Sequence, residues 1–239
     1  MPIAVGSAHL ATAGESVCGD ACVIVDMAQG VLLGVADGLG HGPSAREAAD
    51  AACAHVRAHV NDPLDILLRG VDRALVGTRG AVVSLMALDP KAGWARFAGV
   101  GNVELHTLSR ANMAAPNTPG ILGRGFRSVR VWEHPLAEGD LLVMTSDGVS
   151  IHFDLKTFAH LAPQALADAL VARFHKKHDD ASCAVARVTP LAALGGSGGV
   201  SSPPTSIGGF GGVSAPSARS AMYPHHLPCT SSYLFRLCH

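Results

Sequence analysis

Four aspartate motifs in this sequence have the residue types and placement of a metal-dependent catalyst. Each motif joins an aspartate to a glycine or to a second aspartate, where an apolar stretch begins or ends: Gly19-Asp20, Asp37-Gly38, Asp147-Gly148 and Asp179-Asp180. A hydrophobic core does not need carboxylates there. Single Asp-Gly pairs are common in turns, but repeated placement at strand ends favours a shared function over turn chemistry alone.

Carboxylates that converge without basic partners repel one another unless a cation lies between them. Mg²⁺ and Mn²⁺ are hard cations that prefer carboxylate, carbonyl and water oxygens, and a glycine beside an aspartate lets its carbonyl approach the ion. Two such ions sharing one carboxylate polarise a phosphoryl group and activate a bridging water. Several such aspartates in one chain therefore predict bound cations rather than a salt-bridge network.

Short apolar stretches must position these aspartates. Turn residues separate the stretches and predict strands over 3–11, 21–27, 31–36, 82–88, 95–100, 103–108, 129–133, 141–145 and 183–188. Helical periodicity is confined to 43–60, 63–76 and 163–175. Turn residues in 89–93 and 99–102 predict two hairpins. We therefore expect an α+β fold of two stacked antiparallel sheets flanked by helices.

The charge balance and the apolar segments exclude several function classes. Lys and Arg total 18 and Asp and Glu 19, so no basic excess favours nucleic acid or an anionic membrane. No apolar run approaches the roughly 18 residues of a membrane-spanning helix, and the N-terminus lacks the basic segment of a secretory signal. We expect a cytoplasmic protein whose 6 cysteines are free thiols. The sequence also lacks a P-loop and a GxSxG motif.

The composition changes after Pro190. Segment 191–239 carries only Arg219 and Arg236 as charged residues, and Gly, Ser and Pro make up 22 of its 49 positions. Such a segment has too few large apolar side chains to offset the entropy of ordering. We expect one folded domain over 1–190 and a disordered Gly/Ser/Pro-rich tail over 191–239.

The motifs also resemble those of a known family in their order and strand context. The segments 18–20 (CGD), 35–42 (VADGLGHG), 145–149 (TSDGV) and 179–182 (DDAS) are similar to the ordered motifs of the protein phosphatase 2C (PPM) family, in its bacterial SpoIIE-like branch. The resemblance extends over about residues 3–189. The absence of a sensor or coiled-coil segment ahead of the domain is most similar to the stand-alone phosphatases of the bacterial stressosome.

The resemblance implies a four-layer α/β/β/α sandwich with two Mn²⁺ or Mg²⁺ ions in a cleft at one end of the sheets. By motif position, Asp37 bridges both ions and the Gly38 carbonyl binds one of them. Asp147 and Asp179 complete the second ion's ligands, and Asp20 supports the site or an additional ion through water. Asp180 follows as a supporting residue, with the reverse assignment of Asp179 and Asp180 left open. The expected metal ligands are Asp20, Asp37, Gly38, Asp147, Asp179 and Asp180, and the expected catalytic residues are Asp37 and Asp147.

The resemblance also implies a phosphorylated protein as the partner, with phosphoserine or phosphothreonine as the hydrolysed group. A STAS-domain protein of a stressosome is the expected substrate, and no nucleic acid or membrane is expected as a partner. A phosphorylated anti-sigma-factor antagonist is the alternative within the same chemistry. The alternative from another class is a catalytically silent phosphatase-like module that binds a partner protein.

Several basic residues leave two interpretations open. His41 lies further behind the first Asp-Gly than the histidine of eukaryotic family members, so it is either the leaving-group acid or a loop residue. The N-terminal region shows no match for the family's phosphate-binding arginine. Arg124 and Arg127 either contact a phosphoprotein or are solvated. The run 175–178 (HKKH) fits a helix end with favourable cations better than a zinc site.

Overall fold

A computed structural model describes residues 1–111 and 113–190. The strands are β1 (Ile3–Leu10), β2 (Asp20–Met27), β3 (Gly30–Gly38), β4 (Ala81–Asp89), β5 (Trp94–Val100), β6 (Glu104–Leu108), β7 (Trp132–Pro135), β8 (Leu141–Thr145) and β9 (Ala181–Val188). The helices are α1 (Pro43–Ala58), α2 (Leu64–Ala74), α3 (Leu155–Phe158) and α4 (Pro163–Phe174). The tail predicted over 191–239 lies outside the described residues.

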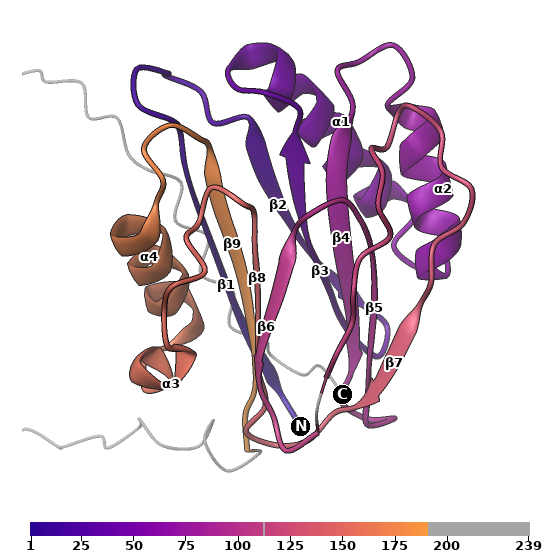
Figure 1. Cartoon of the computed structure of the whole chain (residues 1–239). Helices are drawn as coiled ribbons and strands as arrows, with labels where there is room; N and C mark the ends of the chain where they lie inside the picture. The colour runs from indigo at the N-terminus through magenta and orange to yellow at the C-terminus, as the bar shows by residue number, and fades with distance from the viewer. Residues whose placement is uncertain (112, 191–239) are drawn as a thin grey trace, which may run out of the picture.

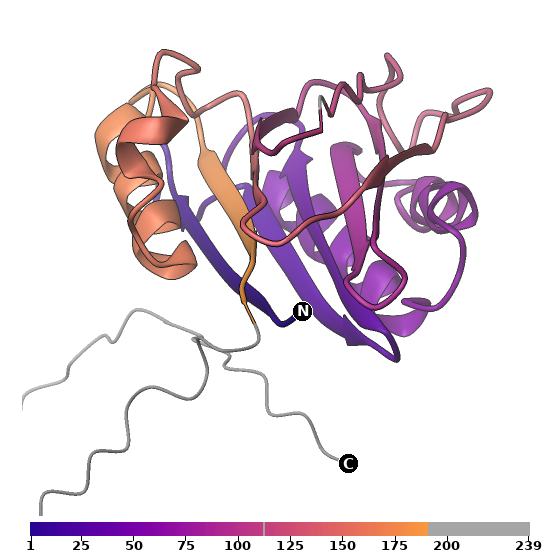
Figure 2. The same cartoon turned by 90° about the horizontal axis from the view of Figure 1, so that it is seen from below.

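The strands form two antiparallel sheets that stack face to face. One sheet has the order β1-β9-β8-β6 and the other the order β2-β3-β4-β5-β7. Helices α1 and α2 cover the outer face of the five-stranded sheet, and α3 and α4 cover the four-stranded sheet (Figure 1). The view from below shows the same four layers (Figure 2). The predicted fold, two antiparallel sheets flanked by helices, is confirmed.

Alternation of side chains along β3 explains how one strand serves two layers. Val31, Leu33 and Val35 point into the core between the sheets, where they meet residues of β8 and β9. Leu32 and Ala36 point the other way and pack against α1 and α2. Because both faces of the strand are covered, its sequence reads as a continuous apolar run. Burial of each large side chain contributes roughly 1.5–3 kcal/mol to the stability of this strand.

The structure corrects three sequence predictions. The first concerns segment 99–102, which was predicted to form a hairpin; β5 and β6 instead belong to different sheets, and the chain crosses from one sheet to the other there. A turn of this composition fits a hairpin and a crossing equally well, since both flanking strands are apolar in either case. The hairpin predicted at 89–93 is confirmed, because β4 and β5 pair on either side of it.

The other two corrections concern the boundary of β7 and an additional helix. Strand β7 was predicted over 129–133 and is shifted to Trp132–Pro135, because its register is set by pairing with β5. It is an edge strand, so Pro135 is tolerated at its end. The four-residue helix α3 is too short to show periodicity and was not predicted; Asp154 caps it by accepting a hydrogen bond from the Lys156 backbone N–H.

Two further observations concern the cysteines and the helices. The four cysteines within the described residues are free thiols, as predicted: Cys18, Cys22, Cys53 and Cys183. In the same part of the chain, none of the helices combines the length and the apolar character needed to cross a membrane.

Candidate active site

Three of the predicted aspartates line one cavity at the end of the sandwich where the β1–β2 loop lies, the upper end in Figure 1. Asp37 is the penultimate residue of β3, in the five-stranded sheet. Asp147 follows β8 and Asp179 precedes β9, both in the other sheet. The cavity has a volume of about 510 Å³. Residues far apart in the sequence therefore meet because the two sheets stack with these strand ends at the same edge. The remaining lining residues are Leu39, Gly40, Val82, Gly101, Asn102, Pro119, Gly120 and Ile121.

Asp20 lies behind this cavity. Its residue is only 1% exposed, it is paired directly with Asp37 across the β2–β3 ladder, and its Oδ2 accepts a hydrogen bond of 2.8 Å from the Ser182 hydroxyl. Burial raises the pKa of Asp20 to about 6, against the opposing effect of hydrogen bonds from the Ser146 and Ser182 hydroxyls. Asp20 is thus a neighbour of Asp37 and not a lining residue.

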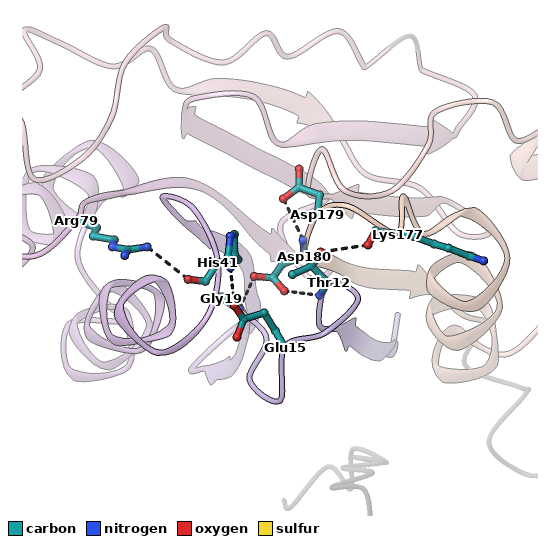
Figure 3. A network of polar contacts seen from close by, with 8 residues as sticks. All are labelled: Thr12, Glu15, Gly19, His41, Arg79, Lys177, Asp179 and Asp180. Carbon is teal, nitrogen blue, oxygen red and sulfur yellow. Dashed lines mark hydrogen bonds and ion pairs between the residues drawn. The ribbon is translucent and has the colours of Figure 1, made fainter.

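Asp180 is held in a different way. Its Oδ1 accepts the Thr12 backbone N–H at 2.8 Å and its Oδ2 accepts the Gly19 backbone N–H at 2.7 Å (Figure 3). These bonds tie both ends of the β1–β2 loop to the start of β9, and Asp180 is not among the residues that line the cavity. Asp179 lines the cavity, while one of its carboxylate oxygens accepts the Asp180 backbone N–H at 3.0 Å. The two adjacent aspartates therefore face different surroundings.

The glycines beside the aspartates are required by close packing. A Cβ at Gly38 would collide with the backbone of Ala45 in the first turns of α1. A Cβ at Gly148 would collide with the Asp180 carbonyl, and one at Gly19 would lie 2.7 Å from the Asp180 Oδ2. Gly38 is buried and does not line the cavity. Gly38 is predicted to offer its carbonyl to an ion, and the packing gives a second reason for a glycine at that position.

The pKa values of the cavity carboxylates show how strongly these side chains repel one another. Burial raises the pKa of Asp37 to about 9, and repulsion from Asp20, Asp147 and Asp179 adds to the effect. The pKa of Asp179 is also raised, by burial and then by Asp147. Within the described residues, no three Asp, Glu, His or Cys side chains are grouped closely enough to hold an ion as they stand. The chemistry of the set suits a divalent cation, because carboxylate oxygens are the ligands that such ions prefer and a cation would offset the repulsion among them.

Asn102 and Lys176 contact Asp147 and were not among the predicted site residues. Asn102 lines the cavity, and its Nδ2 donates a hydrogen bond of 2.7 Å to the Asp147 Oδ2. Lys176 Nζ donates to the Asp147 backbone carbonyl at 2.6 Å. In the sequence Asn102 is visible only as part of the Gly101-Asn102 turn, which was predicted as a hairpin although it belongs to the crossing between the sheets.

The basic residues that the sequence left open lie outside the cavity lining. His41 is exposed, and its Nδ1 lies 2.7 Å from the Glu15 Oε1. Helix α4 ends at Phe174, so the run 175–178 follows the helix and does not form its last turn. His175 Nε2 is hydrogen-bonded to the Asp179 carbonyl at 2.7 Å, so this run supports the residue that precedes β9.

Comparisons with known proteins identify the family and the fold of this chain. Residues 28–189 match the family described as stage II sporulation protein E (SpoIIE). The phosphoserine phosphatase RsbX of Bacillus subtilis is 24% identical over 140 residues, which cover 58% of this chain and 70% of RsbX.

Solved structures show the same fold. A structure from a study of the bacterial stressosome as a modular system adapted to control secondary messenger signalling is 33% identical. It superimposes with a TM-score of 0.76 over 78% of this chain and 100% of that one. The crystal structure of RsbX in complex with magnesium is 19% identical, with a TM-score of 0.70 over 78% of this chain and 96% of that one. The family predicted from the ordered aspartate motifs is confirmed: this chain belongs to the SpoIIE family and has the fold of PP2C-type phosphatases.

Proposed function

We propose that this protein is a divalent-metal-dependent phosphatase that hydrolyses phosphoserine or phosphothreonine on a bacterial signalling protein. The observation that carries the proposal is the cavity shared by Asp37, Asp147 and Asp179, which the two sheets bring to one edge. Membership of the SpoIIE family and the similarity to a phosphoserine phosphatase support the reaction class. A silent binding module is disfavoured, since a binding surface gains nothing from repelling carboxylates.

Each residue has a role that follows from its contacts. Asp37, Asp147 and Asp179 would hold two Mn²⁺ or Mg²⁺ ions, with the Gly38 carbonyl and Asp20 as the additional ligands that the family resemblance implies. When bound, the ions supply stabilisation of charge on the phosphoryl oxygens and a lowered pKa for water. Asn102 orients Asp147 through its hydrogen bond.

Asp180 and Lys176 act through the surrounding backbone. Asp180 fixes the loop that precedes Asp20, although its direct binding to an ion remains the alternative assignment. Lys176 fixes the segment that carries Asp147. These contacts reduce the freedom of the ligand-bearing segments, which favours a preformed site.

The proposed substrate is a phosphorylated STAS-domain protein of a stressosome-like assembly. Its support is the similarity to RsbX and to a structure from a study of the stressosome. A phosphorylated anti-sigma-factor antagonist is the second candidate, supported by the similar fold of 61% of the structure that contains the RsbU and RsbW domains of Mycobacterium tuberculosis Rv1364c. We place the reaction in the cytoplasm, where free thiols such as the four in the described residues persist.

The test is hydrolysis by metal-stripped protein, with Mn²⁺ or Mg²⁺ added back. p-Nitrophenyl phosphate and a phosphoserine peptide are used as substrates, and Asp37→Asn is the inactive control. We expect metal-dependent turnover that the substitution abolishes. If the protein binds the metal but hydrolyses none of the three substrates, p-nitrophenyl phosphate, the phosphoserine peptide and a phosphorylated STAS protein, the phosphatase proposal is refuted.

A further inference from the structure

Arg79 lies at the rim of the aspartate cavity. The β3–β4 ladder pairs Gly38 with Ala81, and the Leu39 backbone N–H donates to the Gly80 carbonyl, so the next position places Arg79 beside Gly40. Gly40 lines the cavity, and a Cβ added to it would lie 3.0 Å from Arg79 Nη1. The guanidinium therefore lies against a residue of the cavity lining, although Arg79 is not itself one of the lining residues.

The Arg79 guanidinium is oriented by a further contact. Nη1 donates to the His41 carbonyl at 3.4 Å, as Figure 3 shows. This bond uses one of the five N–H donors of the guanidinium, and the residue is exposed. The remaining donors are free to bind a ligand that enters the cavity.

A second arginine lies at the same rim. Arg124 Nη2 donates to the Arg79 backbone carbonyl at 3.4 Å. The segment that carries Arg124 is fixed, because Asp72 Oδ1 accepts the backbone N–H groups of Gly123 and Gly125 at 2.7 and 3.1 Å. The same segment contributes Pro119, Gly120 and Ile121 to the cavity wall. The two arginines thus belong to the frame of the cavity.

Neither arginine is neutralised by an acidic partner. The ion pairs within the described residues are His41–Glu15, Arg46–Asp50 and Arg96–Glu133, and none includes Arg79 or Arg124. Two unpaired guanidinium groups at the mouth of a cavity favour an anionic ligand there. Arginine suits phosphate in particular, because its planar set of donors binds two oxygens at once.

We propose that Arg79, with Arg124 beside it, binds the phosphoryl oxygens of the substrate at the mouth of this cavity. The inference rests on the proposed function, since it identifies the group that holds the substrate of that reaction. The phosphoryl group would then be recognised by Arg79, shortly before β4, and by the segment after β6.

The experiment compares Arg79→Ala, Arg79→Lys, Arg124→Ala and the double variant Arg79→Ala/Arg124→Ala. Arg73→Ala is the matched control, because Arg73 is exposed in the last turn of α2 and, unlike Arg79, neither lies against Gly40 nor bonds to His41. The measurements are KM and kcat for p-nitrophenyl phosphate and a phosphoserine peptide with Mn²⁺, the inhibition constant of inorganic phosphate, and calorimetric binding of Mn²⁺ and of inorganic phosphate.

We expect Arg79→Ala to raise KM for both substrates and the inhibition constant of phosphate by about tenfold or more, the loss typical of a hydrogen bond to a charged group. Arg79→Lys should be intermediate, since it keeps the charge and loses the two-point contact. Arg124→Ala should have a smaller effect in the same direction. Mn²⁺ affinity should stay within about twofold in all variants, because an arginine does not bind a cation.

Unchanged constants in both Arg79→Ala and the double variant would overturn the inference. A raised KM for the peptide alone, with normal constants for p-nitrophenyl phosphate and inorganic phosphate, would also overturn it by assigning Arg79 to the polypeptide. If the unmodified protein shows no metal-dependent turnover, the proposed function fails. Calorimetry with inorganic phosphate then still decides whether Arg79 binds the anion.

Discussion

Asp20 and Asp37 lie directly opposite each other at the end of the β2–β3 ladder. Asp20 is 1% exposed and accepts a hydrogen bond from the Ser182 hydroxyl, whereas Asp37 borders the cavity. Two carboxylates at one cross-strand position repel each other when both are ionised. Either a proton or a cation must therefore relieve the pair, which links the stability of the metal-free protein to pH.

The first prediction is that Asp37→Asn stabilises the metal-free protein at pH 8. Burial, and then repulsion by Asp20, raises the pKa of Asp37 from its ordinary value of 3.8 to about 9. For an acid with a raised pKa, the folded state favours the neutral form. The contribution of Asp37 to the free energy of unfolding is therefore complete below pH 3.8 and is lost as the pH rises towards 9. Asn keeps the shape without the charge, and we expect a gain on the order of 1–3 kcal/mol.

Thermal melts in EDTA between pH 5 and 9 measure this effect. The melting temperature of the unmodified protein should fall with pH more steeply than that of Asp37→Asn. Asp26→Asn is the control, because Asp26 is exposed on the neighbouring strand β2 and lies opposite the apolar Val31. Parallel pH profiles for all three proteins would show that Asp37 is not under electrostatic strain.

The second prediction separates the two adjacent aspartates. Asp179→Asn should weaken Mn²⁺ binding at least about tenfold and leave the melting temperature of the metal-free protein unchanged or raised, because Asp179 lines the cavity and is repelled by Asp147. Asp180→Asn should destabilise the metal-free protein by about 1.5–3 kcal/mol. It replaces one acceptor of the Thr12 and Gly19 N–H groups with a donor.

Calorimetric titration with Mn²⁺ and melts in EDTA distinguish the two roles. The opposite result, with Asp180→Asn losing metal affinity at unchanged stability, would assign direct ligation to Asp180.

Much of the fold was predictable because burial on both sides leaves a clear pattern. Strand β3 and strand β8 are covered on two faces and read as unbroken apolar stretches that stop at Asp37 and before Asp147. The path of the chain after β5 was not predictable, since a glycine-containing turn between apolar strands fits both a hairpin and a crossing. Only the pairing of β6 with β8 decides between them.

The site was predictable to the same extent. Aspartates at strand ends are visible in the sequence because carboxylates are rarely placed there without a function. Asn102 and Arg79 gave no such signal: an asparagine after glycine is ordinary turn chemistry, and an exposed arginine is ordinary surface. Their relation to the cavity arises from the crossing between the sheets and from the register that sets Arg79 beside Gly40.

The third prediction concerns Asn102, whose amide holds the carboxylate of Asp147. Asn102→Ala should lower the affinity for Mn²⁺ by about 10–100-fold, the range typical of residues that orient metal ligands. Calorimetric titration with Mn²⁺ measures the effect independently of turnover. Asn61→Ala is the matched control, because Asn61 is an exposed asparagine between α1 and α2. Equal affinities in both variants would mean that Asp147 does not depend on Asn102.

The fourth prediction decides between the two interpretations of His41. The exposed imidazole pairs with Glu15 and does not line the cavity, so we expect His41→Ala to keep kcat within about threefold. A leaving-group acid would matter far more for phosphoserine, whose alkoxide must be protonated, than for p-nitrophenyl phosphate, whose leaving group is stable without a proton. The kcat ratio of the two substrates is therefore the measurement.

Glu15→Gln is the control, since it breaks the same pair without removing the imidazole. A loss of about 100-fold or more on the phosphoserine peptide alone, seen in His41→Ala and not in Glu15→Gln, would make His41 the acid.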